Sequence, residues 1–68
     1  MNEDVINMEI RKFLKKVGIT SQREIEKALQ AASVSGTLPD SEPVAVSITL
    51  EMPAAGLVHK VEGTIALE

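Results

Sequence analysis

Hydrophobic residues recur every three to four positions in the first part of the chain, which is the spacing of one face of an α-helix. This pattern predicts a helix over about residues 3–17. Asn2 stands just before it, where its side chain can accept hydrogen bonds from the first free N–H groups. Gly18 follows it, and glycine readily adopts the left-handed conformation at which many helices end. The hydrophobic positions of this run are Ile6, Ile10, Phe13, Leu14 and Val17.

A second helical run begins shortly after this glycine. Ser21 and Glu24 form the S-x-x-E pattern of a capping box, in which each side chain satisfies a free N–H group at a helix start. We therefore expect a second helix over about 22–32. Residues 33–43, SVSGTLPDSEP, are rich in turn-forming residues and show no periodicity, which predicts a linker. The inward-facing positions of the second helix are Ile25, Ala28, Leu29 and Ala32.

The last third of the chain alternates hydrophobic and polar residues, which is typical of β-strands with one buried face. The alternation predicts one strand over 44–52 and a second over 57–67. Between them, the segment Pro53-Ala-Ala-Gly56 predicts a short turn closed by a left-handed glycine. This turn would place Met52 opposite Leu57, Leu50 opposite His59, Ile48 opposite Val61, Val46 opposite Gly63 and Thr49 opposite Lys60, with Glu51 diagonal to Lys60.

The expected fold class is α+β, with two N-terminal helices packed on a C-terminal antiparallel β-hairpin in the order α-α-β-β. We expect residues 1–68 to form a single small domain. A two-stranded sheet has two open edges, and a hairpin is marginally stable alone. A homodimer with a continuous four-stranded sheet is one way to use such an edge.

Composition limits how this fold can be stabilised. The chain has 68 residues and no cysteine, so neither disulfides nor thiolate-bound metal can support a small core. The absence of cysteine fits a reducing cytosol. No segment has the pattern of a signal peptide or of a membrane-spanning helix, so we expect a cytoplasmic protein without membrane contact. Leu67 and Glu68 are either native or the start of a purification-tag linker.

Nucleic-acid binding is the alternative that the charges raise. The net charge is −3, and residues 37–68 hold five acidic residues against one lysine, which disfavours contact with phosphates. Helix-turn-helix proteins carry a small residue four positions before the turn glycine and hydrophobic residues six and nine after it, whereas this chain has Leu14, Glu24 and Lys27 there. The candidate nucleic-acid contacts, for this alternative only, are Lys12, Lys15, Lys16, Arg23 and Lys27.

The sequence offers no catalytic, cofactor-binding or metal-binding constellation. His59 is the only histidine, and neither a zinc site nor a general base with its partner can be assembled around it. We expect His59 to lie at the edge of the core, and a small-molecule site beside it is a third, weaker hypothesis. Gly63, inside a predicted strand, would mark a bulge or a close helix contact. We therefore expect a protein that is not an enzyme and has no cofactor.

The whole chain resembles a family of short bacterial proteins classed as a domain of unknown function. The segments that carry the resemblance are IRKFLKKVGITSQREIEKAL at 10–29 and HKVEGTIALE at 59–68. The resemblance implies a small intracellular bacterial protein and supplies no activity or ligand. Our hypothesis from the sequence is a non-catalytic protein-interaction or structural module, self-associating through a hairpin edge or binding an unknown protein partner. The alternative is a nucleic-acid-binding protein with a helix-turn-helix-like pair and a wing-like hairpin.

Overall fold

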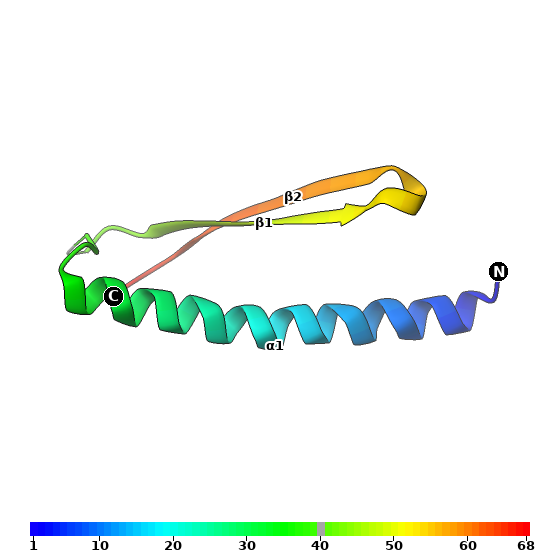
Figure 1. The fold of residues 1–68 in the computed structure, drawn as a ribbon, viewed down its shortest axis with the longest axis horizontal. Coiled ribbons are helices and arrows are strands. Elements are labelled where there is room, and N and C mark those ends of the chain that lie inside the picture. Colours follow the sequence, from blue (N-terminus) through cyan, green and yellow to red (C-terminus); the bar gives the residue numbers. More distant parts are fainter. Residues whose placement is uncertain (40) are drawn as a thin grey trace. The chain divides into compact units, whose positions relative to one another are not determined.

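The computed structural model describes residues 1–39 and 41–68. Its elements follow in the order α1 (Glu3–Ser35), β1 (Val44–Met52), η1 (Pro53–Ala55) and β2 (Leu57–Ile65) (Figure 1). The chain divides into two units, Met1–Leu38 and Pro39–Glu68. The first unit is the helix, and the second is the hairpin. The fold class is α+β as predicted, whereas the expectation that the whole chain is one domain stays a prediction.

The prediction of two N-terminal helices is wrong, because α1 is a single continuous helix of 33 residues. Neither the stop at Gly18 nor the start at Gln22 is formed. Positive φ occurs only at Gly36 and Gly56 among the described residues, so Gly18 has no left-handed conformation. The predicted helices over 3–17 and 22–32 are therefore two parts of α1, which also takes up the first three residues of the predicted linker 33–43.

Side-chain hydrogen bonds around Gly18 fit a helix interior rather than a helix start. The Thr20 hydroxyl donates to the backbone oxygen of Lys16 at 2.8 Å, a bond typical of threonine within a helix. Glu24, expected to cap the second helix with Ser21, instead accepts a bond from the Lys27 ammonium at 3.3 Å. The predicted capping box does not form.

Local energies explain why the glycine signal was misleading. A glycine in a helix interior costs about 1 kcal/mol relative to alanine, and a good N-cap gains about the same amount. The local signals for stopping and continuing are therefore nearly balanced. The structure continues the helix through Gly18, and Leu14 and Ile25, which are eleven residues or about three turns apart, then share one face.

The two ends of α1 are capped. The Asn2 side-chain oxygen accepts from the backbone N–H groups of Asp4 at 3.1 Å and Val5 at 3.2 Å, which confirms the predicted N-cap. At the other end, Gly36 is left-handed with φ 75°. The Thr37 N–H donates to the Ala32 oxygen at 2.9 Å, and the Gly36 N–H donates to the Ser33 oxygen at 3.2 Å. These two bonds form a Schellman motif, the kind of helix stop that the sequence predicts at Gly18.

Removing the N-cap side chain will destabilise α1. We expect Asn2→Ala to lower the free energy of unfolding by about 1 kcal/mol, because two backbone N–H groups lose their acceptor. Urea denaturation followed by circular dichroism, at one fixed protein concentration, measures the change. Asn2→Asp is the matched control, since a carboxylate accepts the same bonds. An Asn2→Ala midpoint equal to that of the unmodified chain would contradict the assignment.

The hairpin agrees closely with the sequence-based prediction. β1 occupies Val44–Met52 as predicted, and β2 begins at Leu57 but ends at Ile65 rather than at residue 67. The strands pair antiparallel, and the predicted register is confirmed at all five positions, from Met52 opposite Leu57 to Val46 opposite Gly63. The pairing runs through Gly63 one residue to one, so this glycine marks no bulge.

The turn of the hairpin is also confirmed. Pro53–Ala55 form one short 3₁₀ turn, and Gly56 closes it with φ 63°. The Gly56 N–H donates to the Pro53 oxygen at 3.0 Å. Because the left-handed conformation strains residues with a side chain, glycine at this position determines where β2 begins.

No residue of the described part of the chain is buried. This is unusual for a chain in which 44% of the residues are hydrophobic. A lone helix and a two-stranded hairpin each have hydrophobic faces but no interior. Taken by itself, neither unit has an interior in which its hydrophobic face could be buried.

Candidate interaction surfaces

One face of α1 carries hydrophobic or small residues over almost its whole length, and Glu24 interrupts it between Val17 and Ala28. We call this face the apolar stripe. Phe13 and Leu14 are exposed, at 51% and 53%, and six further members from Ile6 to Ala32 are half-buried. Hydrophobic side chains of this size normally lie against a partner surface. The members of the apolar stripe are Ile6, Ile10, Phe13, Leu14, Val17, Ser21, Ile25, Ala28, Leu29 and Ala32.

The two halves of the apolar stripe differ in side-chain size. Up to Val17 every member is large, and Phe13, the only aromatic residue of the chain, lies in this half. From Ser21 onward, small residues alternate with large ones. The stripe therefore consists of large side chains near the N-terminus and of mixed small and large side chains near the C-terminus.

Four of the five candidate nucleic-acid contacts share a face of α1. Lys12, Lys16, Arg23 and Lys27 follow one another at intervals of four, seven and four residues, which returns them to the same side of an α-helix. Lys15 projects from a different side. We call the four the basic row. They lie on one rigid helix, without the turn that a helix-turn-helix protein needs to present its second helix to DNA.

Acidic residues reduce the positive charge of this face. Lys27 forms an ion pair with Glu24 at 3.3 Å, with both side chains about three-quarters exposed. Glu9 stands seven residues before Lys16 and so begins the same row. Gln22 donates from its side-chain amide to Glu26 at 2.9 Å on a neighbouring line. The side of α1 that borders the apolar stripe and carries the basic row is therefore of mixed charge.

The hairpin has one hydrophobic face and two unpaired edges. β1 and β2 form a two-stranded sheet, and within the described residues neither strand has a second neighbour. Ile48 and Val61 face each other on the hydrophobic side and remain 42% and 54% exposed. Both edges offer free backbone N–H and C=O groups, which are able to pair with another strand. The other members of this face are Val44, Val46, Leu50, Met52, Leu57, His59, Gly63 and Ile65.

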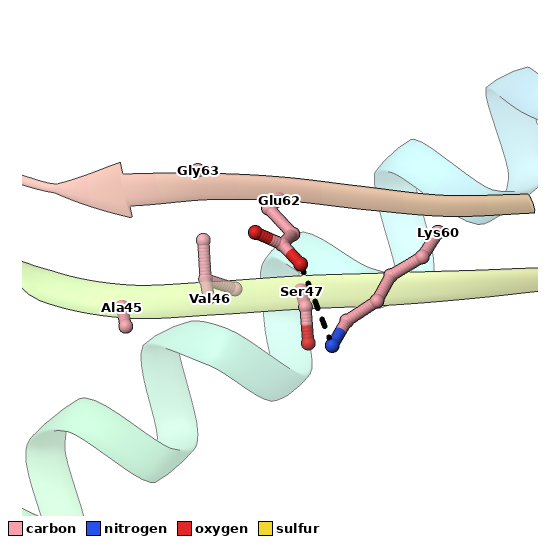
Figure 2. Close-up of a pocket in the computed structure, with 6 residues that line it drawn as sticks. All are labelled: Ala45, Val46, Ser47, Lys60, Glu62 and Gly63. Atoms are coloured by element: carbon pink, nitrogen blue, oxygen red, sulfur yellow. Dashed lines mark ion pairs between the residues drawn. The ribbon is translucent and has the colours of Figure 1, made fainter.

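A shallow hollow lies on the hairpin. Figure 2 shows its six lining residues, with the side chains of Lys60 and Glu62 directed toward one another. Their charged groups are 3.5 Å apart, so the lysine pairs with Glu62 and not with Glu51 as the sequence had suggested. The hollow has a volume of about 300 Å³. Its lining is Ala45, Val46, Ser47, Lys60, Glu62 and Gly63.

The hollow has little of what a ligand site needs. Its ammonium and carboxylate groups neutralise each other, and it does not include His59, which is exposed and paired opposite Leu50. Among the described residues, no group of three or more His, Cys, Asp or Glu side chains could hold a metal ion. The hypothesis of a small-molecule site beside His59 therefore gains no support.

The sequence-based prediction of two helices did not include the apolar stripe as one continuous surface. Its two halves were assigned to two helices, yet they are in phase across Gly18. The eleven-residue interval from Leu14 to Ile25 was the available signal.

The chain belongs to DUF6494, a family of unknown function whose sequence profile covers residues 1–68. This confirms the family resemblance noted from the sequence. Neither the curated proteins nor the solved structures contain a match to this chain. In the described part of the structure, no helix is both long and hydrophobic enough to cross a membrane.

Proposed function

We propose that this protein is a non-catalytic interaction module of the cytoplasm that works by associating with other protein chains, first of all with a second copy of itself. The observation that carries the proposal is that each unit, taken by itself, has a hydrophobic face and no interior, one being a single helix and the other a two-stranded sheet, in a chain that is 44% hydrophobic. Folded domains of this size bury roughly 60% of the surface that their unfolded chains expose. Association supplies the burial that a helix and a hairpin lack on their own.

Each unit supports this proposal in its own way. An amphipathic helix gains most of its stability in proteins from packing of its hydrophobic face, and not from intrinsic helix propensity. A two-stranded hairpin is at best marginal in water. Burial of a single Phe, Leu or Ile side chain contributes about 1.5–3 kcal/mol, so covering even part of the apolar stripe outweighs a substantial loss of chain entropy.

The non-catalytic and cytoplasmic parts of the proposal come from the sequence. The chain has one histidine and no cysteine, and its acidic residues do not form the paired arrangement of a general acid and base. A chain without cysteine forms no disulfide, and this fits a reducing compartment such as the cytosol, where disulfides are rare.

Nucleic-acid contact is a second candidate, and the observation in its favour is the basic row on α1. A straight row of four cations can follow a phosphate backbone without a helix-turn-helix. The net charge of −3 and the Lys27–Glu24 ion pair oppose it. We therefore place it behind self-association.

Light scattering coupled to size exclusion tests the proposal. We expect a mass that is a multiple of the 7.3 kDa chain at high concentration, and a helical circular dichroism signal that falls on dilution. A 7.3 kDa species at every concentration, with an unfolding midpoint independent of concentration, would contradict self-association. The same dilution series, repeated with duplex DNA at about 50 mM salt, tests the second candidate. A protein–DNA complex that dissociates as the salt concentration rises would favour nucleic-acid binding.

A further inference from the structure

We propose that the apolar stripe of α1 docks against the apolar stripe of a second copy of the chain, with the two helices antiparallel and overlapping over their full length. This inference rests on the proposed function and deepens it, since it names the surface, the partner and the direction of pairing. Four properties of α1 carry it: the register of the stripe, the sizes of its residues, the charges along its border, and its length.

The register follows from the bounds of the helix. α1 runs from Glu3 to Ser35, so full antiparallel overlap places residue 19 of one copy at the level of residue 19 of the other. In that register each member of the bulky half of the stripe, except Leu14, faces another member of the stripe. The facing pairs are Ile6 with Ala32, Ile10 with Ala28, Phe13 with Ile25, and Val17 with Ser21. Eight of the ten members of the stripe are matched in this way, while Leu14 stands level with Glu24 and Leu29 with Glu9.

The sizes of the facing residues favour the antiparallel direction. Ile6 and Ile10 each face an alanine, and Val17 faces a serine, so a large side chain meets a small one in three of the four pairs. Large opposite small lets the two helices keep an even separation of roughly 8–10 Å. A parallel pair in register would set Phe13 against Phe13 and Ala28 against Ala28. That arrangement would be crowded near the N-terminus and leave voids near the C-terminus, which is unfavourable in protein interfaces.

The charges along one border of the stripe are complementary in the same direction. This border carries Glu9, Lys16 and Lys27, whereas Glu24 lies on the stripe itself, seven residues after Val17 and four before Ala28. In an antiparallel pair this border faces itself. Glu9 then comes within two residues of the level of Lys27, about 3 Å along the axis, and Lys16 stands in the same relation to Glu24. Both contacts occur twice by symmetry.

The length of α1 makes such a contact substantial. Its 33 residues span about 50 Å. They correspond to more than four heptads, and helix pairing is recognisable in sequences from three to four heptads onward. An isologous two-fold contact of this kind also closes on itself, so it yields a dimer and not an open filament.

Directional cross-linking tests the inference, and the absence of cysteine from the chain makes it clean. The Ile6→Cys and Ala32→Cys variants of the full chain are mixed and oxidised in a glutathione buffer, and the disulfides are quantified by mass spectrometry. Ile10→Cys with Ala28→Cys forms a second, independent pair. Lys15→Cys with Arg23→Cys is the matched control, because these residues also lie at one level in the antiparallel register but outside the stripe.

We expect the mixed disulfide of each stripe pair to exceed both homodisulfides, and the control pair, by about 100-fold, since neighbouring thiols have effective concentrations near the millimolar range. Equal or faster homodisulfide formation by Ile6→Cys alone would overturn the antiparallel direction. A dimer by light scattering that cross-links at no stripe position would overturn the surface and leave the proposed function standing. A strict monomer in the same samples would overturn both.

Discussion

A chain carrying Phe13→Asp will be monomeric at concentrations where the unmodified chain associates. The substitution removes the only aromatic side chain, which lies in the bulky half of the apolar stripe, and puts a carboxylate in its place. Loss of one buried Phe removes about 2 kcal/mol from each copy, and desolvation of the carboxylate adds to this. For the two copies together we expect the dissociation constant to rise about 1000-fold or more.

Met8→Asp is the matched control for this prediction. Met8 is also a large exposed hydrophobic residue of α1, at 67%, but it lies outside the apolar stripe. Sedimentation equilibrium of the two variants and the unmodified chain measures the dissociation constants. We expect Met8→Asp to remain within a few-fold of the unmodified chain, as is typical of a surface position. Dissociation constants that rise equally in the two variants would show that the stripe is not the contact surface.

Gly18→Pro will break α1 in its middle and lower the free energy of unfolding by about 3 kcal/mol or more. Proline cannot donate the backbone hydrogen bond, and its ring clashes with the preceding turn of the helix. Gly18→Ala will act in the opposite direction and stabilise the chain by about 1 kcal/mol, because alanine loses less conformational freedom than glycine in a helix. There is space for the added methyl group, since a Cβ at this position meets no atom within 4 Å.

Gly36→Ala is the control for the direction in which Gly18→Ala changes the free energy of unfolding. Gly36 ends α1 in the left-handed conformation with φ 75°, where a side chain is strained, so alanine there will destabilise by about 1 kcal/mol. Urea denaturation at a fixed concentration compares the three variants. If Gly18 ended a helix, Gly18→Ala would destabilise just as Gly36→Ala does. Opposite signs for the two alanine variants therefore distinguish one continuous helix from two.

These two experiments probe successive requirements of the same surface. An unbroken α1 is needed before the residues on either side of Gly18 can form a single stripe. The stripe is then needed for the contact that we propose. A chain with a broken helix should also associate more weakly, because at most half of the stripe can dock at one time.

The hairpin and the N-terminal start of α1 could be predicted from local sequence, whereas its end at Gly36 was not predicted. Alternation with a period of two assigned the residues of β1 and β2, and the Gly56 turn determined the register, because a shift of one residue would exchange the two faces. Asn2 was identified as the N-cap for the same reason, since a cap depends only on residues within one turn. Such features are decided by interactions between near neighbours, which a sequence displays directly.

The continuity of α1 and the choice of ion pairs were decided only in the structure. At Gly18 a glycine stop and an S-x-x-E start compete with continuation at about 1 kcal/mol each, so the hydrogen bonds and hydrophobic phase of the whole helix settle the outcome. Lys60 likewise had two acidic neighbours within reach, and side-chain geometry selected Glu62. Where local preferences nearly cancel, many small interactions between residues further apart select the conformation. Those interactions are known only from the three-dimensional structure.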